Sequence, residues 1–120
     1  MELNEITETV IGCAMKVSST LGTGFLEKVY ENALAVEMKK AGLSFGQQES
    51  VRVRYEGECV GDYVADFVVE GQVLLELKSA KTIDAAHQAQ LLNYLRATGM
   101  KVGLLLNFGT PRMGIKRMML

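Results

Sequence analysis

Apolar residues recur every three to four positions in three stretches of the chain, which predicts three helices. The first helix covers residues 4–21 and ends at a paired-glycine turn, Gly22-Thr23-Gly24. Thr23 is the predicted cap of the second helix, whose apolar stripe runs over residues 25–38 and closes at Gly42. The third covers residues 84–98, and Gly99 is its stop signal.

Short apolar or alternating runs between these stretches predict strands. Strands are expected at residues 50–55, 59–69 and 73–78, joined by turns at 56–58 and 70–72 that suit an antiparallel meander. A buried strand is expected at 101–107 and a last edge strand at 115–120. The order α-α-β-β-β-α-β-(β) predicts an α/β fold, a mixed sheet flanked by helices, in one domain of residues 1–120.

Composition limits the class of protein. Apolar residues make up 48% of the chain and charged residues 22%, which is typical of a globular domain. No apolar run is long enough to cross a bilayer, so no membrane association is expected. No basic segment precedes an apolar run at the N-terminus, so a cytoplasmic location is expected.

Charge is unevenly distributed, although the net charge is only −1. No Asp or Glu follows Asp84, while five basic residues do: Arg96, Lys101, Arg112, Lys116 and Arg117. This segment could form a phosphate-facing surface or simply a solvated basic face.

Acidic and basic residues interrupt two of the apolar strands. Glu76 and Lys78 lie two apart and therefore point to the same side, with Leu77 directed the other way. A hairpin through residues 70–72 can bring Asp66 beside Glu76. Two neighbouring carboxylates repel each other, and a hard divalent cation would relieve that repulsion. A structural ion pair at the strand end is the alternative.

The residues Asp66 and Glu76-Leu77-Lys78 resemble the PD-(D/E)XK nuclease signature, with Ala65 where that signature has proline. The element order resembles the restriction-endonuclease-like αβββαβ core of that superfamily. Residues 24–30 read GxxExxY, which resembles the GxxExxY protein family within it. Gln90 and Tyr94 resemble the QxxxY motif of RecB-like members.

This resemblance implies roles for the matching residues. Asp66, Glu76 and the Leu77 carbonyl would hold Mg²⁺, or Mn²⁺ as its substitute, with Glu27 as a further ligand. Lys78 would assist the attacking water, and Gln90 would position that water or the Lys78 ammonium. Three residues would support the site or contact phosphate: Tyr30, His87 and Tyr94.

The function expected from the resemblance is metal-dependent hydrolysis of phosphodiester bonds in nucleic acid, with DNA as the expected substrate. A nucleic-acid-binding or regulatory module that keeps the nuclease fold without cleaving is the first alternative. A structural or interaction protein, whose charged cluster is only an ion-pair network, is the second. A homodimer is one way in which so small a domain could offer enough surface to bind a duplex.

Overall fold

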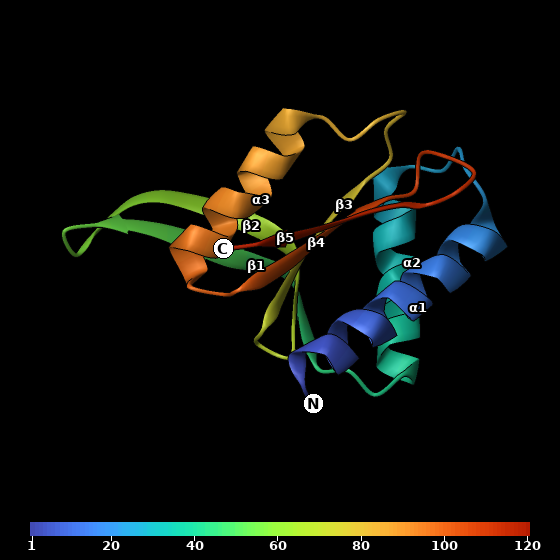
Figure 1. Ribbon diagram of the computed structural model, residues 1–120, viewed down its shortest axis with the longest axis horizontal. Coiled ribbons are helices and arrows are strands. Elements are labelled where there is room, and N and C mark those ends of the chain that lie inside the picture. The colour runs from blue at the N-terminus through green and yellow to red at the C-terminus, as the bar shows by residue number, and fades with distance from the viewer.

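The computed structural model describes residues 1–120 and contains three helices and five strands (Figure 1). Helices α1 (Leu3–Leu21) and α2 (Glu27–Lys40) come first and are followed by strands β1 (Phe45–Tyr55), β2 (Glu58–Val69) and β3 (Val73–Lys78). Helix α3 (Ala85–Thr98) separates these strands from β4 (Val102–Asn107) and β5 (Gly114–Met119). The α/β class, the element order and the final edge strand are therefore confirmed. No helix is both long and apolar enough to span a membrane.

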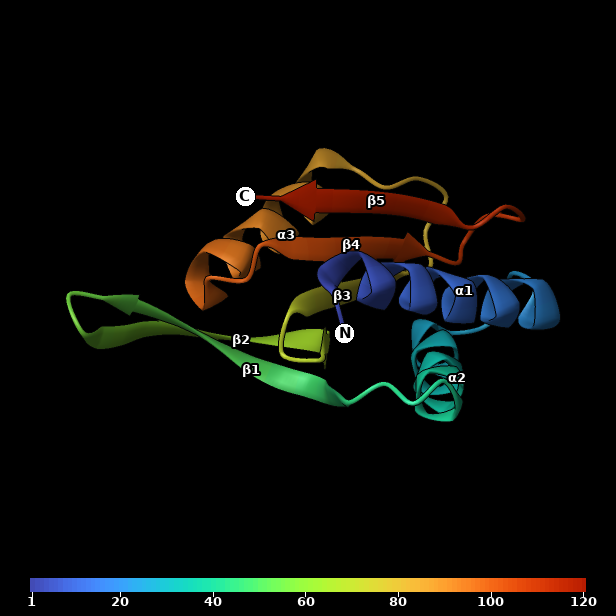
Figure 2. The same cartoon turned by 60° about the horizontal axis from the view of Figure 1, so that its bottom comes forward.

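The strands form a single mixed sheet in sequence order, β1-β2-β3-β4-β5. Neighbouring strands are antiparallel except β3 and β4, which run parallel and are connected by α3. Helices α1 and α2 pack against one face of the sheet, and α3 packs against the other (Figure 2). Every residue of β4 is buried, as is all of β3 except Lys78, because these central strands are covered on both faces. Most of these buried residues are apolar, and Glu76 and Asn107 are the exceptions.

The β1–β2 hairpin extends well beyond the rest of the sheet, and it forms one end of a molecule 46 Å long (Figures 1 and 2). Its turn consists of Glu56 and Gly57, which both adopt positive φ angles of 50° and 83°. A two-residue turn of this kind matches the right-handed twist of the flanking strands. The predicted turn is thus confirmed.

Two local predictions differ from the structure. Helix α2 begins at Glu27 with Leu26 as its cap residue and no side-chain capping bond, so the predicted Thr23 cap is wrong. The preceding loop is fixed instead by Tyr30, whose hydroxyl donates to the Gly22 carbonyl and accepts from the Phe25 N–H at 3.3 Å.

The second difference concerns the start of β1, which lies five residues before the predicted position at Ser50. Residues 45–49 are mostly polar and show no strand pattern. They are recruited by pairing with β2, and by an edge-to-face contact of Phe45 with Phe67 at 5.6 Å between ring centroids.

The ends of β3 and β4 are connected by a buried amide. Asn107 accepts from the Ala80 N–H at 3.0 Å and donates to the Ala80 carbonyl at 2.9 Å, and its oxygen also accepts from the Gly109 N–H. A Cβ at Gly109 would lie 2.2 Å from the Ala80 carbonyl oxygen. Gly109 is therefore required for this close backbone contact, which holds the segment directly after Lys78.

We expect Gly109→Ala to lower the free energy of unfolding by about 2 kcal/mol or more, because the backbone of residue 80 must shift. Gly12→Ala is the matched control: Gly12 lies inside α1 with open space around its Cβ position. This control should raise stability by about 0.5–1 kcal/mol. Urea unfolding followed by circular dichroism measures both. Equal stability of the two variants would contradict the proposed backbone contact.

Candidate active site

The candidate site lies where β2 and β3 separate. Backbone pairing between these strands ends at Phe67 and Leu75, so the next two residues, Asp66 and Glu76, face each other without a ladder bond. Their carboxylates instead accept hydrogen bonds from backbone N–H groups of the opposite strand. The Glu76 carboxylate accepts from the Asp66 N–H at 2.7 Å, and the Asp66 carboxylate accepts from the Leu77 N–H at 2.8 Å. The two carboxylates therefore converge on one face, as the hairpin argument predicted.

Burial makes the negative charge of this pair costly. The Glu76 residue is only 5% exposed. Desolvation, followed by repulsion from Asp66, raises the pKa of Glu76 to about 8. Desolvation also raises the pKa of Asp66, even though the Leu77 N–H stabilises its charged form. The pair therefore favours a bound cation, whether a proton or a metal ion.

Two further charged side chains act on this pair. Lys78 lies on the same strand face as Glu76. Its positive charge partly offsets the rise in the pKa values of Asp66, Glu76 and Glu27. Glu27 is the first residue of α2, and its own pKa is raised by desolvation and by the charge of Asp66. The structure thus gathers one ammonium and three carboxylates around the end of β3.

Sequence reasoning missed a fourth carboxylate, Glu31, which is 4% exposed. It accepts hydrogen bonds from Lys28 at 3.0–3.1 Å, from Gln48 at 3.0 Å and from Gln47. Burial alone would raise its pKa, but these donors outweigh burial and lower it. Glu31 is therefore ionised and fully engaged in bonds within the protein. Its position one helical turn after Glu27 was the available signal.

Gln48 is the second residue that the sequence did not reveal. Its amide nitrogen donates to Glu31 at 3.0 Å and to Asp66 at 3.2 Å, which links α2 to β2. Gln48 has a positive φ of 56°, and its pairing with Asp66 is missing from the β1–β2 ladder, whose register also shifts between Val53 and Arg54. This unfavourable backbone conformation directs the amide toward both carboxylates. No sequence pattern predicts such a local distortion.

Two of the residues predicted to support the site, Tyr30 and His87, stabilise the fold instead. Tyr30 is fully buried and stacks on Phe108 at 4.9 Å between ring centroids, within the core under α2. The His87 backbone N–H donates to the Asp84 carboxylate at 3.0 Å, and its ring nitrogen accepts from the Asp84 N–H at 3.4 Å. These reciprocal bonds cap the start of α3, and neither residue is part of the carboxylate cluster.

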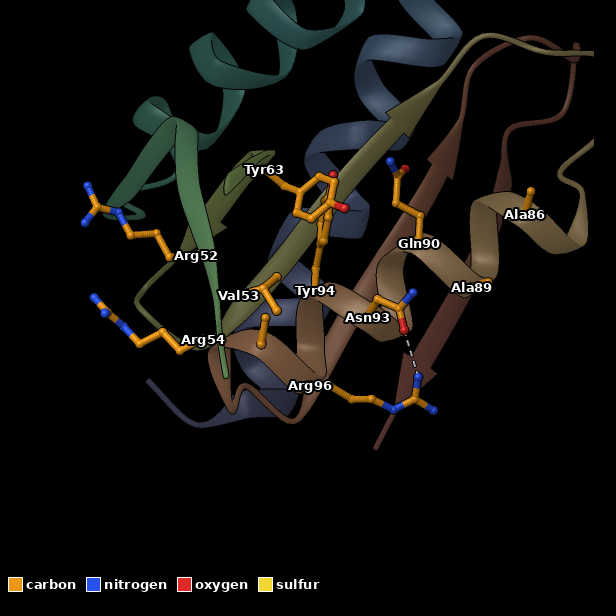
Figure 3. A pocket seen from close by; sticks show the side chains of 11 residues that line it. Arg52, Val53, Arg54, Tyr63, Ala86, Ala89, Gln90, Asn93, Tyr94 and Arg96 are labelled. Atoms are coloured by element: carbon orange, nitrogen blue, oxygen red, sulfur yellow. Dashed lines mark hydrogen bonds between the residues drawn. The ribbon is translucent and has the colours of Figure 1, made fainter. Parts of the chain in front are cut away.

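Gln90 and Tyr94 lie on α3 and face the β1–β2 hairpin (Figure 3). Burial raises the pKa of the Tyr94 hydroxyl, and the charges of Glu76 and Asp66 raise it further. Tyr94 is therefore close enough for the charges of the carboxylate pair to act on its hydroxyl. Gln90 is exposed, and together with Tyr94 it lines a groove between the β1–β2 hairpin and α3.

The donor set at the end of β3 suits a hard divalent cation. Asp66 and Glu76 supply carboxylate oxygens, the ligands that Mg²⁺ prefers, and their mutual repulsion would be relieved by positive charge. No three Asp, Glu, His or Cys side chains lie close enough together to hold an ion by themselves. Asp66 and Glu76 are therefore the two side chains that could contribute to a metal site, and Glu27 lies outside the pair.

A helix-flanked mixed sheet with paired carboxylates and a lysine on adjoining strands defines a class of nuclease folds. The chain belongs to the PD-(D/E)XK nuclease superfamily, whose family model matches residues 4–118. No curated protein matches this chain.

Similarity to a solved structure supports the same fold. The crystal structure of SSO0001 superposes with a TM-score of 0.57 at 17% sequence identity. The alignment covers 97% of this chain and 58% of that protein, so this chain spans little more than half of its length. At this identity the similarity concerns the fold alone.

The raised pKa of Glu76 predicts an unusual pH dependence of stability in the metal-free protein. The unfolded chain releases this proton near the ordinary pKa of 4.5, whereas the folded protein keeps it until about pH 8. The contribution of Glu76 to stability is therefore greatest below pH 4.5 and decreases as the pH rises toward 8. We expect a loss on the order of 2–4 kcal/mol across this interval from Glu76.

Thermal unfolding in EDTA between pH 5 and 8 measures this effect, with Glu76→Gln as the variant that cannot titrate. Glutamine keeps an oxygen for the Asp66 N–H, so the variant should fold and show a flatter pH profile. Glu58→Gln, on the exposed hairpin tip, is the control and should behave like the wild type. Identical profiles for wild type and Glu76→Gln would contradict the assigned cause.

Proposed function

We propose that this chain is a divalent-metal-dependent nuclease that hydrolyses phosphodiester bonds in DNA. The observation that carries the proposal is the convergence of Asp66 and Glu76 through reciprocal hydrogen bonds to Leu77 and Asp66, with Lys78 on the same strand face. The GxxExxY motif at residues 24–30 supports assignment to the GxxExxY group of the superfamily. A cytoplasmic location remains part of this proposal.

Asp66, Glu76 and the Leu77 carbonyl are the proposed ligands of Mg²⁺ or Mn²⁺. When bound, the ion would neutralise the carboxylates, polarise a phosphate and acidify a water molecule. Glu27, which lies outside the carboxylate pair, is proposed to bind through a water of the ion's hydration shell. These assignments are supported by the oxygen donors and by the unfavourable charge of the metal-free pair.

Lys78 is proposed to act on the attacking water. Its ammonium is held on the same face as Glu76, and it is absent from the four salt bridges of the structure. It is therefore available to orient a water molecule and to stabilise the negative charge that develops on the phosphate. Gln90 is proposed to position the same water or the Lys78 ammonium from α3.

We expect cleavage of DNA with Mg²⁺ or Mn²⁺ and none with Ca²⁺, because calcium tolerates looser coordination geometry. Glu76→Gln and Lys78→Met should each lower the cleavage rate by about a hundredfold or more. Glu58→Gln and Lys101→Met, which change exposed residues outside the cluster, are matched controls and should retain the wild-type rate. Unchanged cleavage in both cluster variants would exclude this cluster as its source.

Metal binding can be tested apart from cleavage. Isothermal titration with MgCl₂ at pH 8 should show binding at millimolar concentration or below in the wild type and a large loss in Glu76→Gln. Thermal stabilisation by Mg²⁺ should be smaller at pH 5, where a proton occupies Glu76. Absence of binding at millimolar Mg²⁺ would favour a structural ion-pair network. Binding of both metal and DNA without turnover would favour the regulatory module.

A further inference from the structure

A groove of about 820 Å³ separates the β1–β2 hairpin from α3 (Figure 3). Val53 and Tyr63 line it from the hairpin, and Gln90, Asn93 and Tyr94 line it from the helix. Alanines on the same helix face leave much of this space open. The groove is not part of the carboxylate cluster, although Gln90 and Tyr94, which resemble the QxxxY motif, lie on its helix side.

The groove carries positive charge and no negative charge. Arg52, Arg54 and Arg96 are among its lining residues, and no Asp or Glu is. Arg96 lies on the helix side and donates to the Asn93 side chain at 2.9 Å. Arg52 and Arg54 stand at the hairpin rim with their guanidinium groups directed away from α3 (Figure 3). None of the three forms a salt bridge with a carboxylate, so all three are available to an anionic ligand.

An aromatic surface lies inside the groove. The rings of Tyr63 and Tyr94 are in contact, with centroids 5.7 Å apart. Tyr94 is buried, whereas Tyr63 is 51% exposed and presents its ring to the groove. An exposed ring supported from behind by a second ring is a suitable stacking surface for a nucleobase. The amides of Gln90 and Asn93 add donors and acceptors along the same wall.

One lining residue, Tyr94, also lies within electrostatic reach of the carboxylate pair. The charges of Glu76 and Asp66 act on its hydroxyl. The volume falls within the range of sites for small ligands, about 300–1,000 Å³. A volume of this size can hold a few nucleotides of one strand.

We propose that the groove between the β1–β2 hairpin and α3 binds single-stranded nucleic acid, with a base stacked on Tyr63 and the strand directed toward Asp66 and Glu76. Arg96 contacts a phosphate, and the rim arginines attract the strand electrostatically. The direction of the strand rests on the proposed nuclease function. The binding itself does not, because it depends on residues outside the carboxylate cluster.

The test is a binding measurement that needs no turnover. Fluorescence anisotropy compares a short labelled oligothymidylate with a hairpin duplex of matched length, in EDTA, for the wild type and in a Glu76→Gln background. The single strand should bind more tightly than the duplex. Tyr63→Ala should weaken single-strand binding roughly five- to a hundredfold, the range for loss of one stacked base. Tyr63→Phe, which keeps the ring, should restore it.

Matched controls come from the same elements. Tyr55→Ala removes a 67% exposed tyrosine near the hairpin tip, outside the groove, and should leave affinity within about twofold. Ala89→Glu places a carboxylate in the groove and should abolish binding, whereas Ala85→Glu on the first turn of α3 should not. Equal affinities of Tyr63→Ala and Tyr55→Ala, or tighter binding of the duplex, would overturn the groove assignment.

The two proposals fail separately. Cleavage of DNA in Mg²⁺, together with single-strand affinity that is unchanged by Tyr63→Ala and Ala89→Glu, would leave the nuclease function in place and overturn the groove. Tyr63-dependent binding of single strands, with no cleavage of any substrate in Mg²⁺ or Mn²⁺, would leave the groove in place and overturn the nuclease function.

Discussion

The site depends on one structural event, the separation of β2 and β3 at Asp66 and Glu76. Beyond Phe67 and Leu75 the strands no longer exchange backbone hydrogen bonds, and buried N–H groups must find other acceptors. The two carboxylates supply them. The same bonds that complete the fold therefore fix the direction of both acidic side chains, so the geometry of the site is set by the requirement to satisfy the backbone.

Two buried glutamates show how their surroundings decide between charge and proton. Glu31 receives three different side-chain donors, which hold its charge and commit it to the scaffold. Glu76 receives one backbone N–H and faces Asp66, so its charge lacks compensation. Residues of one type, about equally buried, thereby serve different purposes: one connects α2 to the sheet, and the other provides a site for a cation.

Periodicity was enough to predict the fold, because helices α1 and α3 and strands β2, β3 and β4 bury regular apolar faces. Strand spacing likewise predicted that Glu76 and Lys78 would share a face, and a hairpin offered a way to bring Asp66 beside Glu76. The start of β1 was not predictable, since its polar residues become a strand only through pairing with β2. Glu31 and Gln48 were missed for a related reason: their importance comes from hydrogen bonds across the tertiary structure, and the left-handed conformation of Gln48 leaves no trace in composition or spacing.

That conformation divides the β1–β2 hairpin into two parts with different partners. On the near side of Gln48, Phe67 and Val69 belong to the core beneath α1 and α2. On the far side, Val51 and Ala65 belong to the smaller core beneath α3. The part of the hairpin beyond Gln48, the distal arm, therefore packs against different neighbours from those that hold the residues next to the acidic pair. Because the two parts pack on separate cores, a change in the length or aromatic content of the distal arm would leave the packing around Asp66 and Glu76 in place.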